Sequence, residues 1–159
     1  MRRWAFVAAL VLAGCRGEAT RNEAPPAPKL VSLVAESASC GKLPKCALFA
    51  ITVRDDGWWH WEGKANVGMP GRKRYQVRRG VWAKVERAVA ALDGKTFACT
   101  QSKPGQPQDK LSWMMSDGTT QAIALDRGCL DKANLPYWQV FDLLWSQMPE
   151  LKPLIGPNQ

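Results

Sequence analysis

The sequence predicts an α+β domain in which a single antiparallel β-sheet carries two helices on one face and is stapled by disulfides. Three observations predict this fold class. Apolar and polar residues alternate on either side of two turns that contain Asp-Gly, two further segments carry apolar residues at helical spacing, and four cysteines follow residue 30. With 159 residues, 46% of them hydrophobic and 23% charged, the chain has room for one hydrophobic core.

The first predicted hairpin joins residues 47–54 and 58–62 through an Asp-Asp-Gly turn. The length of this turn decides which side chains share a face of the sheet. A three-residue turn pairs Arg54 with Trp58 and gathers the apolar side chains on one face, namely Phe49, Ile51, Val53, Trp59 and Trp61. We therefore expect Trp59 and Trp61 in the core, and Trp58 and His60 on the opposite face.

The remaining elements follow from the same kinds of pattern. A second hairpin is predicted over residues 110–125, because a three-residue turn again collects apolar side chains: Leu111, Trp113, Met115, Ile123 and Leu125. Further strands are predicted at residues 30–36 and 72–79. Helical spacing appears in two stripes, the first being Val81, Trp82, Val85, Val89 and Leu92, the second Tyr137, Val140, Phe141, Leu144, Trp145 and Met148. The predicted order is four strands, a helix, an optional short strand, two strands and a helix.

Four cysteines fall within the predicted domain, and an even number indicates two disulfides if the chain is exported, as its N-terminus, described next, predicts. Three pairings are possible. We favour Cys40–Cys46, which closes a short loop, and Cys99–Cys129, which brackets the second predicted hairpin. A zinc site is the rival interpretation, but the spacings differ from those of zinc ligands and His60 is the one histidine of the chain. No metal or other cofactor is predicted.

The N-terminus resembles the signal sequence of a bacterial lipoprotein. Two arginines precede an apolar run at residues 4–12, which is too short to span a bilayer. The run leads into Leu12-Ala13-Gly14-Cys15, which is similar to the lipobox whose cysteine is acylated and becomes the first residue of the mature protein. We therefore expect residues 1–15 to be a lipoprotein signal peptide with its lipobox, and Cys15 to be the lipidated residue.

The segment after the lipobox indicates where the domain begins and where the protein resides. Residues 16–29 contain three prolines and no apolar periodicity, which predicts an extended tether. The folded domain is expected at residues 30–152 and a C-terminal tail at residues 153–159. Arg16 rather than aspartate follows the lipobox, which favours the outer membrane over the inner membrane. The expected location is the bacterial cell envelope, with the domain in the periplasm or at the surface.

The charge of the chain bears on its partners. The sequence holds 22 basic and 14 acidic residues, a formal net charge of +8. An exported protein meets anionic lipid head groups and acidic polymers, so this charge does not indicate nucleic acid. We expect the membrane as a partner through the lipid anchor, and an envelope protein or an anionic polymer as a further partner.

Residues 46–63, CALFAITVRDDGWWHWEG, resemble the signature of an uncharacterised bacterial domain family. That pattern has a strand with a Cys…Cys loop, a Gly-Asp-Gly turn and a strand ending in Glu-Gly. The Asp-Gly and Glu-Gly pairs match, whereas Phe49 replaces a tyrosine, Ala47 replaces a proline, and Cys40 and Cys46 lie farther apart than the family's cysteines. The similarity covers about residues 30–150; it implies fold and export and transfers no catalytic residue.

Trp58 and His60 form the first candidate binding site. An outward tryptophan beside a polar histidine can stack on a sugar ring or anchor a protein partner. The alternative interpretation is that helices or the N-terminal strand cover this face.

Arg72, Arg74 and Arg78 form the second candidate site. Alternation in a strand over residues 72–79 would place these arginines on one side, where a basic stripe could bind phosphates or an acidic polymer. The alternative is an edge strand whose charges prevent aggregation.

The sequence favours a binding or structural module over an enzyme. It contains no G-x-S-x-G elbow, no phosphate-binding glycine loop and no dinucleotide fingerprint. Two alternatives stay open. One is an inhibitor of an envelope enzyme that presents the loops at residues 41–45 and 101–108. The other is a small hydrolase that uses His60 with Glu62 or a loop aspartate.

Overall fold

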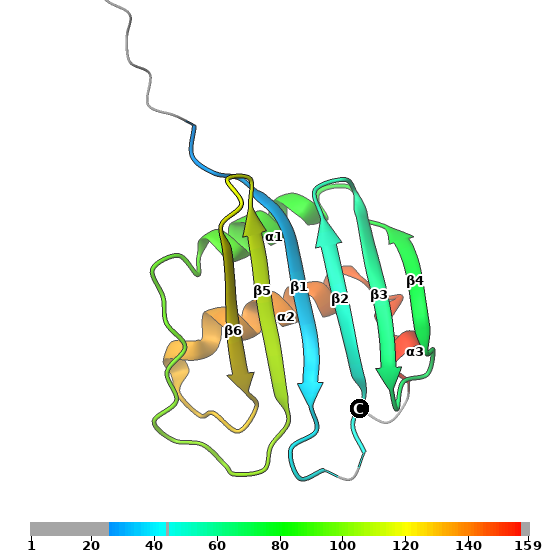
Figure 1. The fold of residues 1–159 in the computed structure, drawn as a ribbon, viewed down its shortest axis with the longest axis vertical. Coiled ribbons are helices and arrows are strands. Elements are labelled where there is room, and N and C mark those ends of the chain that lie inside the picture. Colours follow the sequence, from blue (N-terminus) through cyan, green and yellow to red (C-terminus); the bar gives the residue numbers. More distant parts are fainter. Residues whose placement is uncertain (1–25, 44, 157–159) are drawn as a thin grey trace, which may run out of the picture.

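The computed structural model describes residues 26–43 and 45–156, so the predicted signal peptide, the lipobox and most of the tether lie outside the described residues. The described chain forms one six-stranded antiparallel sheet with the strand order β4-β3-β2-β1-β5-β6 (Figure 1). The strands are β1 (Leu30–Ser39), β2 (Leu48–Arg54), β3 (Trp58–Ala65), β4 (Gly71–Gln76), β5 (Gln108–Met115) and β6 (Thr120–Asp126). The helices are α1 (Val81–Ala90), α2 (Leu135–Gln147) and α3 (Leu151–Ile155), with a 3-10 turn at Lys132–Asn134.

Both predicted hairpins are confirmed with three-residue turns. In the first hairpin Val53 faces Trp59 across the two strands, and Gly57 adopts a left-handed φ of 82°. In the second, Met114 faces Thr120, and Gly118 has a φ of 86°. Glycine suits both positions because a residue with a Cβ atom is strained at positive φ. The registers put the predicted apolar residues of each hairpin on a common face.

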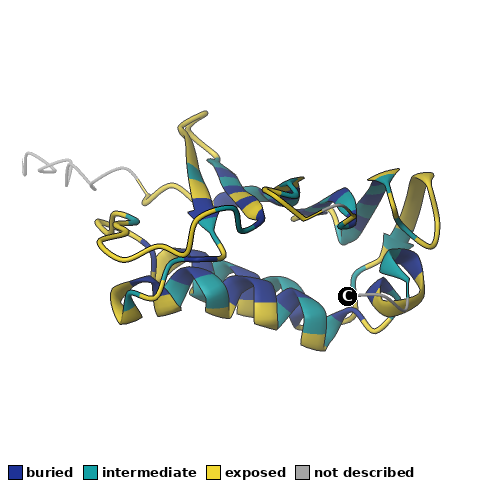
Figure 2. Ribbon diagram, turned by 90° about the horizontal axis from the view of Figure 1, so that it is seen from below, coloured by how far each residue is buried: buried dark blue, intermediate teal, exposed yellow. Residues whose placement is uncertain are grey.

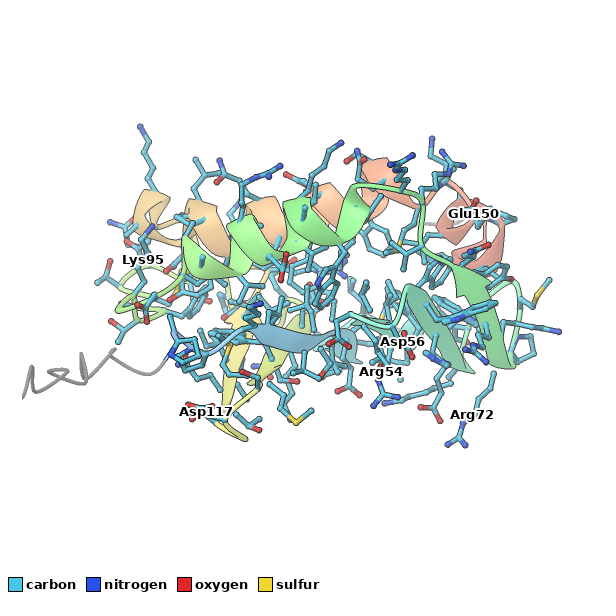
Figure 3. The ribbon with its side chains drawn as sticks, turned by 90° about the horizontal axis from the view of Figure 1, so that it is seen from above. Arg54, Asp56, Arg72, Lys95, Asp117 and Glu150 are labelled. Carbon is cyan, nitrogen blue, oxygen red and sulfur yellow. A yellow bond between two sulfur atoms is a disulfide. The ribbon has the colours of Figure 1, made fainter. Side chains whose placement is uncertain are left out.

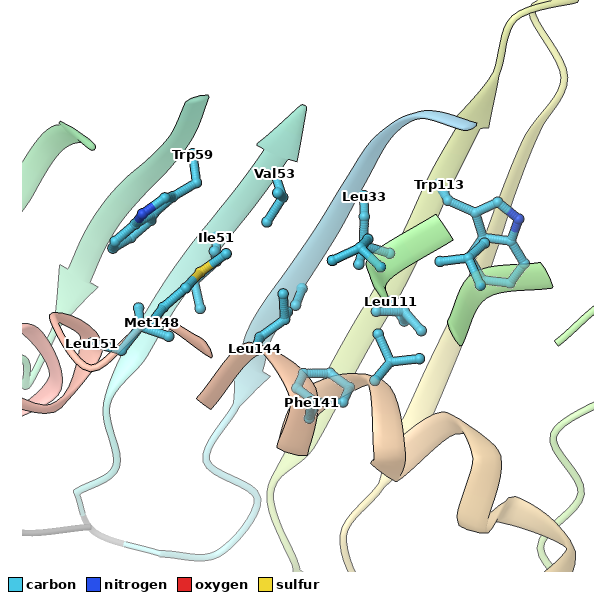
Figure 4. Packing of buried hydrophobic residues seen from close by; sticks show 14 of the residues in the cluster. Leu33, Ile51, Val53, Trp59, Leu111, Trp113, Phe141, Leu144, Met148 and Leu151 are labelled. Carbon is cyan, nitrogen blue, oxygen red and sulfur yellow. The ribbon is translucent and has the colours of Figure 1, made fainter. Parts of the chain in front are cut away.

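The three helices of the described residues pack on one face of the sheet, and within the described part of the chain the other face is uncovered (Figures 2 and 3). The predicted fold class is therefore confirmed. The core lies between the two layers (Figure 4) and includes both expected tryptophans, Trp59 and Trp61, each 1% exposed. Aromatic stacking supports them: Trp61 lies 5.0 Å from Phe49 between ring centroids, and Trp59 lies 4.5 Å from Tyr75.

Two differences from the predicted elements bear on the candidate sites. β4 ends at Gln76, three residues before the predicted end of its strand. The short helix α3 was not predicted; it crosses the expected domain boundary at residue 152 and buries Leu151 and Leu154. Five residues offer too few turns for helical spacing to be recognised, and Pro153 within the segment argues against a helix. The folded domain thus continues beyond residue 152.

Both favoured disulfides are confirmed, with Cα–Cα distances of 5.4 Å for Cys40–Cys46 and 5.6 Å for Cys99–Cys129. They lie at the same end of the sheet, and the chain enters at the opposite end, beside the β5–β6 turn (Figure 1). There Lys29 and Ser116 exchange hydrogen bonds, which fixes the last residue of the tether to the domain. Among the described residues, no helix has the length and apolarity needed to cross a membrane.

Candidate functional site

The candidate site is the uncovered face of β3 and β4, which we call the open-face patch and define as Trp58, His60, Glu62, Arg72 and Arg74. Alternation along β3 turns the buried tryptophans toward the helices and the half-buried Trp58, His60 and Glu62 away from them, and Arg72 and Arg74 are exposed on β4. Register pairs His60 with Arg74 and Glu62 with Arg72 on the neighbouring strand. The structure therefore brings together four of the five predicted binding residues, on the face of the sheet opposite the described helices, where Figure 3 labels Arg72.

The central contact of the open-face patch joins Arg74 to Trp58. The guanidinium carbon of Arg74 lies 3.8 Å from the centroid of the indole ring, a cation–π geometry. Beside this pair, Arg72 donates hydrogen bonds to the Glu62 carboxylate from Nε and Nη2, at 3.4 and 3.2 Å. The stacking holds the indole ring of Trp58 and the guanidinium of Arg74 against each other, so the two side chains present one surface to a ligand.

Arg78, the fifth predicted residue, does not lie on this patch. It follows the end of β4 and forms an ion pair at 3.2 Å with Glu150, which immediately precedes α3. Glu150 lies in the helical layer, opposite Arg72 (Figure 3). The expected stripe of three arginines is thus shortened to two, because the strand ends before alternation reaches Arg78.

The middle of the uncovered face carries small side chains on adjacent strands, namely Ser32, Val34, Ala50, Thr52, Ser112, Ala122 and Ala124. Charged residues lie around this area. Lys64 pairs with Glu36, whereas Arg54, Arg74 and Lys110 have no ion-pair partner in the described part of the chain. The uncovered face therefore has an excess of positive charge that can attract an anionic partner.

His60 lies in the middle of the open-face patch without a catalytic partner among the described residues. It faces Thr52 on one neighbouring strand and Arg74 on the other, and no hydrogen bond joins its ring to a carboxylate. The nearest acid along the strand, Glu62, binds Arg72 instead. A general base needs a group that orients it and a route to the proton it removes. The described geometry gives the hydrolase interpretation no support.

A second feature, which the sequence did not predict, is a groove of about 890 Å³ that is lined by α2, α3, the start of β5 and the residues that follow the end of β6. Asp109 lies at its floor, 3% exposed, and Arg127 donates two hydrogen bonds to its carboxylate, at 2.7 and 3.0 Å. The sequence contained one sign of this buried acid. Asp109 occupies the phase of β5 that Leu111 and Trp113 use for the core, and an acid in that phase indicates a special environment.

The end of the sheet that carries both disulfides forms a third feature. The loops predicted as insertion elements contact each other there, since the amide of Lys42 donates a hydrogen bond to the carbonyl of Gly105 at 2.8 Å. A Cβ atom on Gly41 would lie 2.3 Å from the carbonyl oxygen of Gln106, so only glycine permits this approach. The two loops are therefore held together as one rigid end of the domain.

No protein-family model matches this chain, and no curated protein sequence matches it either. The resemblance to an uncharacterised bacterial family stays a prediction. Function must therefore be inferred from the described geometry.

Proposed function

We propose that this chain is a lipid-anchored binding module of the bacterial cell envelope that recognises a protein partner or an anionic envelope polymer. The open-face patch provides the recognition surface. Cys15 provides the anchor, and the tether holds the domain away from the membrane. The domain lies in the periplasm or at the cell surface, and the outer membrane is the favoured site of anchoring.

One observation carries this proposal: Arg74 stacks on Trp58 at 3.8 Å on the sheet face opposite the described helices. Tryptophan and arginine are enriched among the few residues that dominate the binding energy of protein interfaces. A guanidinium held on an aromatic ring keeps N–H donors free for a carboxylate or phosphate. The small side chains beside it let a partner approach the sheet closely.

The test is crosslinking of the anchored protein in its native envelope, followed by affinity capture and mass spectrometry. We expect Trp58→Ala and Arg74→Glu each to lose the captured partner. Lys73→Glu is the matched control, because Lys73 is an exposed cation on β4 that faces Trp61 in the register and therefore lies in the opposite phase of the strand. Full capture by both patch variants would contradict the proposal, as would equal loss in the control.

A polymer partner is distinguished by a second measurement. The purified chain is bound to immobilised dextran sulfate, a soluble polyanion, and eluted with increasing salt. Binding through the patch predicts earlier elution of Arg74→Glu than of Lys73→Glu, although both variants change the net charge equally. Identical elution of the two variants would show that any binding follows net charge alone.

The lipid anchor has its own test. Growth with a radioactive fatty acid should label the wild-type chain, and Cys15→Ser should abolish the label and release the domain from the membrane fraction. Labelling that survives in the variant would contradict the anchor, while the open-face patch would remain a candidate site.

A second candidate function, inhibition of an envelope enzyme, is favoured by the rigid disulfide end. Inhibitors gain affinity from loops that are already ordered before binding, and here two loops are joined by a backbone hydrogen bond and flanked by disulfides. This end also points away from the tether (Figure 1). Lys42→Glu should then weaken inhibition of an envelope protease or lysozyme while Trp58→Ala leaves it unchanged; the reverse result would assign the binding to the open-face patch.

A further inference from the structure

The groove beneath α2 lies in the helical layer and is separate from the open-face patch. Its volume of about 890 Å³ is within the range of small-molecule sites, roughly 300–1,000 Å³. Residues at spacings of three and four along α2 form one wall, and α3 forms the other. The buried residues Asp109, Phe141 and Leu151 mark its floor, whereas exposed Asp142 and Lys152 mark its mouth.

Most of the groove surface is apolar. Three aromatic side chains come from α2 and three apolar residues from α3, namely Trp138, Phe141, Trp145, Leu151, Pro153 and Ile155. Trp138 and Trp145 are only partly buried although they pack against core aromatics. They stand seven positions apart on the helix, about 10 Å along its axis. The apolar wall is therefore elongated, which suits an extended chain better than a compact ring.

The polar end of the groove has unused donors. Arginine carries five N–H donors, and the two bonds from Arg127 to the Asp109 carboxylate use one on Nε and one on Nη2. The other three have no hydrogen-bond partner among the described residues, and the side chain is 38% exposed. The Asp109 carboxylate balances the single positive charge of Arg127, so a second anion gains mainly the hydrogen bonds of the free donors and must approach from the open side of the guanidinium.

Two further charges line the mouth. Lys152 has no acid within ion-pair distance in the described chain, and Asp142 has no cation. Lys152 adds attraction for an anion, while Asp142 projects from the same face of α2 as the tryptophans and opposes a second negative charge there. This distribution fits a ligand with a single anionic head and an uncharged body.

We propose that the groove binds an acyl-chain amphiphile with one carboxylate head group. The carboxylate bonds the free donors of Arg127, because a guanidinium fork matches two carboxylate oxygens. The acyl chain lies along Trp138, Phe141 and Trp145 and ends against α3. This binding is independent of the open-face patch, so the two proposals can fail separately.

The test uses three probes that share a twelve-carbon chain and differ in the head group: dodecanoate, dodecanol and dodecylammonium. Each displaces a dansyl-labelled undecanoic acid from the purified, disulfide-bonded Cys15→Ser chain, which has no lipid anchor, in detergent-free buffer. We expect dodecanoate to displace the label at a concentration at least tenfold lower than dodecanol, and dodecylammonium to be the weakest. Equal strength of dodecanoate and dodecanol, or tightest binding of dodecylammonium, would overturn the proposal, as would no binding of the label.

Two variants locate the site and test its charge. Ile155→Trp fills the groove and should abolish binding of the label, with thermal unfolding checked to show that the variant folds. Asp142→Asn removes the opposing charge and should tighten dodecanoate two- to fivefold, whereas Asp93→Asn, an exposed acid after α1, should leave it unchanged. Unchanged binding in the Ile155 variant, or weaker dodecanoate binding in the Asp142 variant, would overturn the assignment.

Discussion

Replacing Arg127 by methionine should destabilise the domain far more than its partial exposure suggests. The change leaves the Asp109 carboxylate, which is 3% exposed, without its two hydrogen bonds. Removing one partner of a buried pair costs about 3–5 kcal/mol, and the 38% exposure of the arginine side chain favours the lower end, about 3 kcal/mol. For a domain of this size, such a loss lowers the melting temperature by about 11 °C.

Urea unfolding of the oxidised chain, followed by tryptophan fluorescence, measures this loss. The double variant Asp109→Leu with Arg127→Met should unfold within about 1 kcal/mol of the wild type, because no charge is then left buried. Arg72→Met is the matched control: its pair with Glu62 is exposed on both sides and should cost less than about 0.5 kcal/mol. The reasoning is refuted if Arg127→Met costs no more than Arg72→Met, or if the double variant is the least stable.

Three further predictions concern single side chains. Tyr137→Phe should leave stability unchanged or raise it by about 1 kcal/mol in urea unfolding, because the buried hydroxyl has no partner among the described residues and burial raises the pKa of the phenol. Trp61→Ala should cost about 3–5 kcal/mol in the same assay, whereas Trp58→Ala should cost less than about 1, since only the first is core. Hydrogen bonds from Thr100 hold the pKa of Asp131 below its ordinary value of 3.8. The ionised carboxylate therefore stabilises the folded state at higher pH, and this contribution is lost as the pH falls through the lowered pKa. When the free energy of unfolding is measured against pH, the Asp131→Asn variant should therefore lack this part of the decrease in stability below pH 4.

The sheet could be predicted because its signals are local. Alternation fixes which residues of a strand share a face, and the turn length fixes the register between neighbours. The turn aspartates confirm this: Asp56 and Asp117 each accept a hydrogen bond from the amide two residues later. The outward direction of Trp58 and His60 follows from the same rule, so the position of the open-face patch could be predicted. Arg78 was expected beside Arg72 and Arg74 but lies elsewhere, because its position depends on where β4 ends.

The groove could not be predicted because it depends on distant contacts. Arg127 follows β6 and Trp145 belongs to α2, and only the packing of the helical layer brings both to one cavity. The placement of α3 is similarly non-local. The amides of Gly68 and Met69 donate hydrogen bonds to the carbonyls of Ile155 and Leu154. A Cβ atom at Gly68 would lie 2.6 Å from the carbonyl oxygen of Pro153, so the β3–β4 loop and α3 fit each other only with glycine there.

The two disulfides provide a last prediction, in which chain entropy ranks their contributions. Cys99 and Cys129 are 30 positions apart and Cys40 and Cys46 are 6 apart, so the first closes a much longer loop in the unfolded chain. The loop-closure relation gives about 3.5 kcal/mol for the longer loop and about 2 kcal/mol for the shorter. Double alanine variants of each pair, unfolded in urea, should lose stability in that order.

The native structure around the longer disulfide should survive its removal. Asn134, fully buried, donates to the carbonyl of Ala98 and accepts from its amide, and Leu130 donates to the carbonyl of Gln101. These bonds hold the two segments together without the sulfurs, so the near-ultraviolet circular dichroism should be retained while the urea dependence of unfolding becomes steeper, because the unfolded chain expands. If removal of Cys40–Cys46 lowers the free energy of unfolding more than removal of Cys99–Cys129, chain entropy does not rank the two disulfides. They would then act mainly on the folded state, through the loops that they cross-link.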